Sequence, residues 1–190
     1  MNSMHELRGK LANLHEMNMN YFKEIKQRIE ELKLKNQFIV VGYFTYSFNL
    51  YHEKDYENLC IGSFHLHNFG AKPLTNPYIC LKIASESPFE FSGKYVYKNS
   101  LQNLRLTQGW ERMNDPSDKE EYWLRPMEKR ILEPSEVLSF PNFQVKWQSN
   151  IPYYFNIEGY IYGDEIVHGV KGMNDISIKG TAPKEEEEDD

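Results

Sequence analysis

Two histidines stand at a spacing that could bind a metal ion. His65 and His67 are two residues apart, so on a strand both side chains project from the same face. Two imidazole groups on one face can share a metal ion, and with carboxylates from elsewhere they would give a metal-dependent hydrolase. The neighbouring sequence offers no third ligand at a suitable spacing. We therefore expect strand histidines with no metal and no other cofactor, and we retain the hydrolase as the alternative.

A stripe of tyrosines forms a second candidate site. In the segment 153–162, which alternates like a strand, Tyr154, Tyr160 and Tyr162 fall on one face and apolar residues on the other. Tyrosine is favoured in protein interfaces because a large apolar ring ends in a polar hydroxyl. The stripe therefore predicts a surface that binds a protein partner. The alternative is that the N-terminal helix or a long loop covers these rings.

His168 lies just beyond this segment. Gly163-Asp164 suits a two-residue hairpin turn, so the segments 153–162 and 165–170 are expected to pair. That register places His168 opposite Gly159 on the apolar face. We expect a hydrogen-bonded histidine in the core there, rather than a catalytic base.

Composition and motifs exclude several classes of function. The sequence has no Gly-x-Ser-x-Gly, no phosphate-binding Gly-x-x-x-x-Gly-Lys and no Gly-x-Gly-x-x-Gly, so we do not expect an enzyme. The formal charge is −6, which argues against nucleic-acid binding. Most of the excess acid lies in residues 184–190, whereas residues 1–37 carry seven basic and five acidic side chains. A mildly basic N-terminal segment is thus free to meet an acidic partner or the acidic tail of its own chain.

The start of the chain lacks the pattern of a secretory signal, and no apolar run approaches the roughly 20 residues that cross a bilayer. We therefore expect a cytoplasmic protein without membrane contact. Its two cysteines, Cys60 and Cys80, should then be reduced thiols that pack as small core residues. A cross-strand disulfide is the alternative.

Residues 1–36 predict a long helix with a coiled-coil seam. Apolar residues recur at steps of three and four, with one step of four in place of three, which is a stutter. The expected seam is Leu7, Leu11, Leu14, Asn18, Phe22, Ile25, Ile29 and Leu32. An asparagine on such a seam commonly fixes register and favours a dimer. Self-association through this helix is the prediction, and packing of the helix on its own domain is the alternative.

After Phe38 the pattern changes from helical to alternating. Short segments rich in aromatic and β-branched residues are separated by turn residues, which is typical of an antiparallel sandwich. The expected strands are 38–51, 60–67, 78–83, 93–97, 122–124, 137–147, 153–162, 165–170 and 176–179. The fold class is therefore mainly β, with an Ig-like domain over 37–182. The long polar stretch 99–120 is expected to be a mobile loop, and residues 183–190 a disordered acidic tail.

Two stretches combine turn residues with neighbouring apolar segments. The first runs from Phe64 through Asn68-Phe69-Gly70 to the apolar segment 78–83, and the second is Leu132-Glu133-Pro134-Ser135-Glu136. Both resemble bacterial immunoglobulin-like domains of the CARDB and fibronectin-like kind. Ser135 stands where such domains often have glycine. The resemblance covers about residues 58–170. It implies a sandwich fold and a binding or spacer module, and it carries no catalytic residues.

Together these patterns predict a non-enzymatic protein-interaction module, such as an accessory, adaptor or regulatory protein. It would self-associate through its helix, with a dimer favoured, and present the tyrosine-rich face to a protein partner. The alternative within the binding class is a structural component of a larger assembly, such as a phage or mobile-element product.

Overall fold

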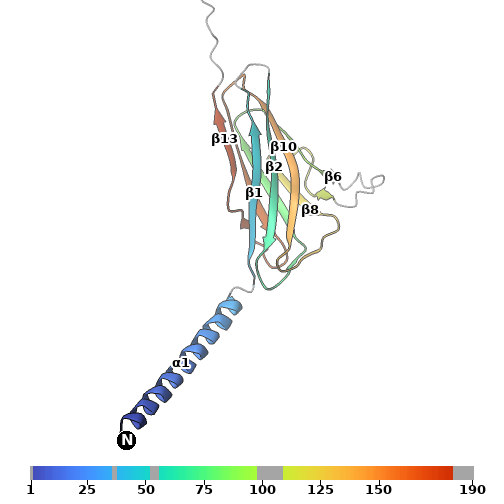
Figure 1. Cartoon of the computed structure of the whole chain (residues 1–190). Coiled ribbons are helices and arrows are strands. Elements are labelled where there is room, and N and C mark those ends of the chain that lie inside the picture. Colours follow the sequence, from blue (N-terminus) through green and yellow to red (C-terminus); the bar gives the residue numbers. More distant parts are fainter. Residues whose placement is uncertain (1, 36–37, 52–55, 98–108, 182–190) are drawn as a thin grey trace, which may run out of the picture. The chain divides into compact units, whose positions relative to one another are not determined.

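The computed structural model describes residues 2–35, 38–51, 56–97, 109–181 (Figure 1). The chain divides into two compact units, Met1–Gln37 and Phe38–Asp190. The predicted acidic tail, 183–190, lies outside the described residues. Among the described residues, no helix is both long enough and apolar enough to cross a membrane.

The first unit is a single helix. α1 (Asn2–Lys35) has 34 residues and is about 51 Å long at 1.5 Å per residue. The described seam side chains are exposed along it, for example Leu11 at 69% and Phe22 at 69%. The helix is confirmed. Self-association through it stays a prediction.

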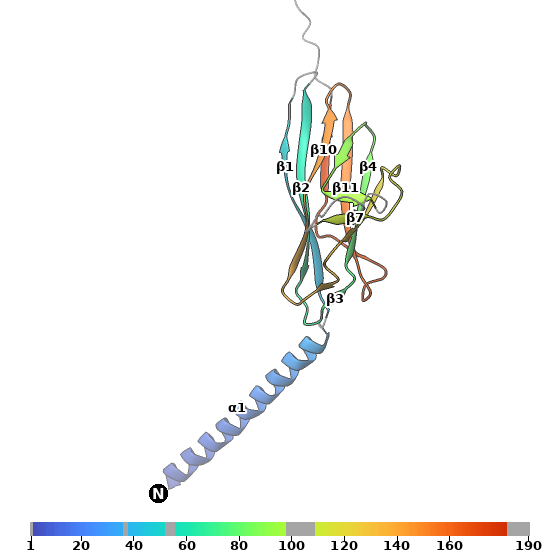
Figure 2. The same ribbon diagram turned by 90° about the vertical axis from the view of Figure 1, so that its right-hand side faces the viewer.

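One layer of the second unit is a four-stranded antiparallel sheet (Figure 2). Along its central strand, Cys60, Gly62, Phe64 and Leu66 are buried, and the residues between them face outward. This period of two matches the sequence pattern, because a strand buried on one face needs apolar residues only at alternate positions. The strands in spatial order are β1 (Val40–Asn49), β2 (Glu57–Asn68), β10 (Val137–Gln148) and β5 (Glu90–Ser92).

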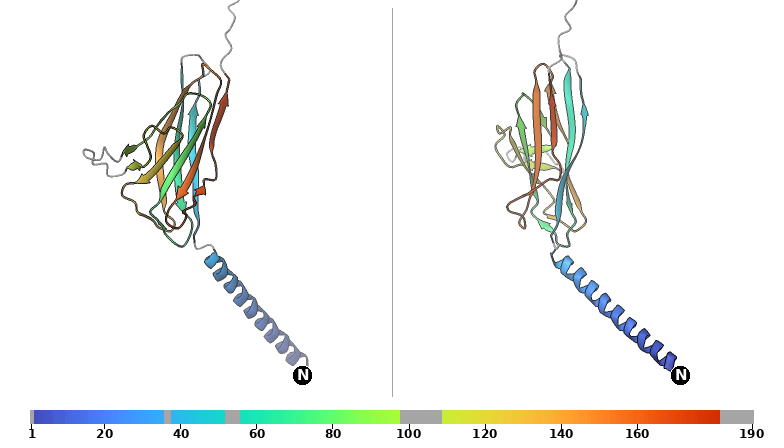
Figure 3. Two further views of the ribbon diagram at one scale, coloured as in Figure 1. Left: turned by 180° about the vertical axis from the view of Figure 1, so that it is seen from behind. Right: turned by 90° about the vertical axis from the view of Figure 1, so that its left-hand side faces the viewer.

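The other layer is a seven-stranded sheet, visible from behind in Figure 3. Its pairs are antiparallel except for β6 and β7, which run parallel. In spatial order the strands are β12 (Val170–Lys171), β11 (Tyr153–Tyr162), β4 (Tyr78–Ser85), β8 (Glu121–Pro126), β7 (Trp110–Arg112) and β6 (Tyr95–Tyr97), with β13 (Ile176–Gly180) also paired to β11. A small third sheet joins β3 (Leu74–Thr75) to β9 (Ile131–Leu132). The mainly β sandwich with an N-terminal helix is confirmed.

The predicted hairpin of 153–162 with 165–170 is wrong. β11 pairs along most of its length with β4, so that Gly159 lies opposite Leu81. After Tyr162 the chain makes turns that include a hydrogen bond from the Gly169 N–H to the Ile166 carbonyl, and it pairs with β11 again only from β12 and then through β13. His168 therefore lies exposed on this connection and is not a core residue. The pattern gave the buried face of β11 correctly but not its neighbour.

The prediction of a long loop over 99–120 is also wrong in part. Residues 99–108 lie outside the described residues, but Trp110–Arg112 forms the buried strand β7. Arg112 is only 3% exposed, and its guanidinium lies 4.2 Å from the ring centroid of Tyr122. The sequence pattern did not predict this strand, because two of its three residues, a glutamate and an arginine, are charged.

Phe64 fills the core where the two sheets meet, packed against three glycines. A Cβ added at Gly159 would lie 2.3 Å from a carbon of the Phe64 ring, and one added at Gly42 would lie 2.7 Å from it. Gly172 also faces the ring, at 3.1 Å. Because real Cβ atoms essentially never come within 3.0 Å of another heavy atom, the ring occupies the space that side chains would take at Gly42 and Gly159, and it leaves little room at Gly172.

Asn68 ends β2 and joins three segments. Its side chain is fully buried, its amide donates to the carbonyls of Lys72 and Leu132 at 2.8 and 2.9 Å, and its carbonyl accepts from Gly70 N–H at 2.9 Å. The backbone carbonyl of Asn68 accepts from Ser135, whose φ is +66°. These contacts explain the Asn-x-Gly stretch, and they place Ser135 in the conformation that glycine adopts most readily.

The outer edge of β1 is met by the connection between β12 and β13. The side-chain amide of Asn174 accepts from Phe44 N–H at 2.8 Å and donates to the Phe44 carbonyl at 3.1 Å. Met173 N–H adds a bond to the Gly42 carbonyl at 2.7 Å. Three backbone groups on this edge are thus satisfied without another strand.

Candidate functional site

The outer surface of the seven-stranded sheet carries four half-buried aromatic side chains, Tyr78, Trp123, Tyr160 and Tyr162, which we call the aromatic face. Tyr162 stacks on Tyr78 with centroids 5.1 Å apart and planes 10° apart, and it lies 5.1 Å from Trp123. The rings come from three adjacent strands, β11, β4 and β8. Tyr78 and Trp123 are 6.2 Å apart, so these three rings contact one another, whereas Tyr160 lies two residues before Tyr162 on the same face of β11.

The structure brings together two of the three predicted tyrosines. Tyr160 and Tyr162 belong to the aromatic face, whereas Tyr154 lies six residues from Tyr160 on the same strand, about 20 Å away. Tyr78 and Trp123 were missed by the sequence analysis. Each stands at an outward position of an alternating strand, but only the strand order shows that they adjoin Tyr162.

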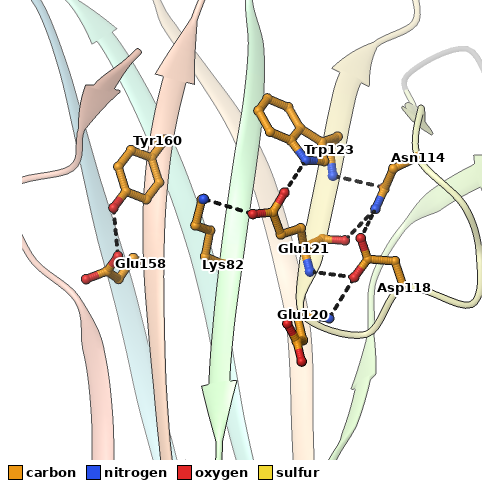
Figure 4. A network of polar contacts seen from close by, with 8 residues as sticks. All are labelled: Lys82, Asn114, Asp118, Glu120, Glu121, Trp123, Glu158 and Tyr160. Atoms are coloured by element: carbon orange, nitrogen blue, oxygen red, sulfur yellow. Dashed lines mark hydrogen bonds and ion pairs between the residues drawn. The ribbon is translucent and has the colours of Figure 1, made fainter. Parts of the chain in front are cut away.

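Ion pairs and hydrogen bonds hold the polar rim of this surface in place (Figure 4). The carboxylate of Glu121 lies 2.8 Å from the Lys82 ammonium and accepts from the Trp123 indole N–H at 2.7 Å. The Tyr160 hydroxyl donates to Glu158 at 2.7 Å. Lys82 also lies 5.6 Å from the Tyr160 ring centroid, within cation–π range. The rings of Trp123 and Tyr160 are thus fixed by their polar atoms.

The same contacts keep both carboxylates charged. The hydrogen bond from Lys82, supported by the one from Trp123, lowers the pKa of Glu121. The pKa of Glu158 is lowered by its hydrogen bonds from Lys171, at 2.7 Å, and from Tyr160. The rim therefore presents two anions and two cations in paired form, and neither carboxyl group is poised as a general acid near neutral pH.

A shallow groove of about 780 Å³ borders the aromatic face, between β4, β11 and the turn before β8. Its lining includes Lys82, Glu121 and Glu158. The turn is ordered by Asp118, whose carboxylate accepts from the N–H groups of Glu120 and Glu121 at 2.9 and 3.0 Å. These bonds position Glu121 for its contact with Lys82.

Cys80 lies beneath the aromatic face. It pairs with Tyr160 on one side and Trp123 on the other, and it is fully buried although it stands on the outward side of β4. Cys60, by contrast, belongs to the core between the sheets. Both thiols are free, as the sequence predicted, and burial raises the pKa of each to about 12.

Because Cys80 lies beneath the aromatic face and Cys60 lies in the core, removal of Trp123 is expected to expose Cys80 alone. In the native protein at pH 8, iodoacetamide should modify neither cysteine, because burial suppresses the reactive thiolate. The Trp123→Ala variant should increase the labelling rate of Cys80 about tenfold or more and leave Cys60 protected. Mass spectrometry of the labelled peptides measures both rates in one sample. Equal labelling of the two cysteines in the variant would mean that Trp123 does not cover Cys80.

The two histidines predicted as the possible metal site have separate partners. The ring nitrogens of His65 lie 2.8 Å from the Thr45 hydroxyl and 2.7 Å from the Ser139 hydroxyl, and burial lowers the pKa of His65. The His67 ring lies against Phe69 with centroids 3.7 Å apart. In the described part of the chain, no three His, Cys, Asp or Glu side chains gather in a way that could hold a metal. This geometry gives the hydrolase alternative no support.

Comparisons with known proteins give little guidance. No family model and no curated protein matches the chain. Among solved structures, a cohesin module from a Clostridium perfringens family 33 glycoside hydrolase aligns over 77% of this chain and all of that one, at 10% identity and a TM-score of 0.38. A Vibrio harveyi exo-β-N-acetylglucosaminidase aligns over 77% of this chain but 18% of its own length, at 9% identity and a TM-score of 0.28. Likenesses this distant support no inference about function.

Proposed function

We propose that this protein is a non-enzymatic protein-interaction module whose sandwich binds a protein partner through the aromatic face. The observation that carries the proposal is the set of four aromatic side chains on the outer surface of the seven-stranded sheet, two of which, Trp123 and Tyr160, have their polar atoms held by charged neighbours. Tyrosine and tryptophan are enriched among the residues that dominate binding energy in protein interfaces.

Two properties of the aromatic face favour a protein as its ligand. Its rings are already fixed by hydrogen bonds and stacking, so little side-chain entropy is lost on binding. Its rim carries paired charges of both signs, from Lys82, Glu121, Glu158 and Lys171. A mixed rim around an apolar centre complements another protein surface, whereas a nucleic acid would require a predominantly basic one.

The test begins with affinity capture of the partner from the native host and then measures its affinity for purified variants. The Tyr160→Ser/Tyr162→Ser variant should bind about 30-fold more weakly or worse, which is the loss expected for an interface hot spot. Tyr43→Ser is the matched control, because Tyr43 is also a half-buried tyrosine and lies on the outer face of the other sheet. Tyr154→Ser should also bind normally.

Unchanged affinity in the double variant would refute the aromatic face as the binding site. The non-enzymatic part of the proposal is tested separately, by metal analysis of the purified protein. Stoichiometric, tightly bound metal would overturn it and restore the hydrolase.

A further inference from the structure

The charges of α1 are sorted by their position relative to the seam. Along the described part of the helix, Lys10, His15 and Lys26 occupy the two positions that flank the seam, whereas Glu16 and Glu24 lie on the opposite face together with one cation, Lys23. The rest of the helical sequence repeats this arrangement. Its flanking positions hold Arg8, Arg28, Lys33 and Lys35, and its outer positions hold Glu6, Glu30 and Glu31.

This sorting disfavours a second copy of the chain as the occupant of the seam. In a parallel coiled coil a flanking residue meets the one five positions further on in its partner, so Arg28 would meet Lys33 and Lys10 would meet His15. In an antiparallel pair the same kinds of position meet each other, again without an acidic residue. Flanking charges of one sign repel each other, and such repulsion disfavours self-association of a helix.

A lipid surface is also a poor occupant. An interfacial helix presents a broad apolar face and binds anionic lipid through excess positive charge. Here the polar Asn18 stands in the middle of the seam, and seven basic residues are nearly balanced by five acidic ones.

We propose that α1 pairs with a helix of another protein, one with a matching apolar seam and with Asp or Glu at its flanking positions. Apolar contact would bury Leu11, Leu14, Phe22 and Ile25, which are 55–69% exposed along the helix, and each flanking cation would gain an acidic neighbour. This partner helix binds α1 rather than the aromatic face, so the proposal stands or falls independently of the function proposed above.

The test uses the full chain and two synthetic helical peptides of equal composition. Both carry leucines that match the seam of α1 and an asparagine opposite Asn18. One has Glu at the flanking positions and Lys on the outer face, and the other has these two sets exchanged. The Glu-flanked peptide should bind about tenfold tighter or better in low salt, as measured by calorimetry. The difference should shrink in about 1 M salt, where exposed charges are screened.

A charge-reversed chain provides the converse experiment. The variant with Lys10→Glu, Lys26→Glu, Arg28→Glu and Lys33→Glu should prefer the Lys-flanked peptide. The Lys23→Glu variant is the control, since Lys23 lies outside the flanking positions, and it should keep the original preference. Circular dichroism checks that both variants retain their helix and sheet.

Three outcomes would overturn the proposal. They are equal binding of the two peptides, a stable homodimer at micromolar concentration that neither peptide displaces, and tighter binding to phosphatidylserine vesicles than to the Glu-flanked peptide. The second outcome would instead establish the homodimer predicted from the seam alone.

Discussion

Replacing Gly159 with alanine is expected to lower the free energy of unfolding by about 3 kcal/mol. The added Cβ would lie 2.3 Å from the Phe64 ring, and that ring is fully buried between the sheets, so neither group can move aside cheaply. Alanine would otherwise be tolerated in a strand better than glycine. Urea denaturation followed by circular dichroism measures the change, and equal stability of variant and parent would contradict this packing.

A double-mutant cycle isolates the contact between Gly159 and Phe64. Phe64→Leu alone should destabilise the sandwich, because it leaves part of the space between the glycines empty. In the Gly159→Ala background the same substitution should cost less, or even restore some stability, since leucine gives the new methyl group room. If the losses of stability in the two single variants simply add in the double variant, then Gly159 and Phe64 do not interact. Gly9→Ala serves as the control, because a Cβ there meets nothing within 4 Å.

Asn68→Ala is expected to cost about 3 kcal/mol. The substitution removes a buried amide that donates to the Lys72 and Leu132 carbonyls, and it leaves both acceptors without that donor. Asn68→Asp should cost more at pH 7, although it has the same shape, because a carboxylate oxygen would then face two carbonyl oxygens in a buried site.

Thermal and urea unfolding of the two variants provide the measurement. Asn49→Ala is the matched control, since Asn49 is exposed near the end of β1 and its amide bonds only the Tyr51 hydroxyl among the contacts described. A loss below about 0.5 kcal/mol is expected there. If Asn68→Asp were as stable as the parent protein, the amide could not be the donor at this junction.

Local patterns predicted the elements of this protein well and their neighbours poorly. The spacing of Leu11, Leu14 and Phe22 was enough to predict a helix, and the alternation around Phe64 was enough to predict a strand and its buried face. No local pattern revealed that β11 lies beside β4, about 70 residues earlier in the chain. The hairpin prediction failed because it assumed a two-residue turn after Tyr162, whereas the chain pairs with β11 again only at Val170.

The candidate site, too, was predicted only as far as local patterns reach. Alternation correctly placed Tyr160 and Tyr162 on the outward side of their strand. Joining them to Tyr78 and Trp123 required the order β11, β4, β8, which depends on packing of the whole sandwich. The charge sorting on α1, by contrast, was present in the sequence from the start. It becomes informative only when the positions beside the seam are considered together with the seam itself.

The contact of Asn174 with β1 has a consequence for solubility. A strand at the edge of a sheet offers unpaired N–H and C=O groups on which another chain can build, and proteins that leave such an edge open tend to aggregate. By bonding both backbone groups of Phe44, Asn174 occupies the place that an intruding strand would need. One side chain from a distant connection thus helps to keep the sandwich from extending into a larger sheet.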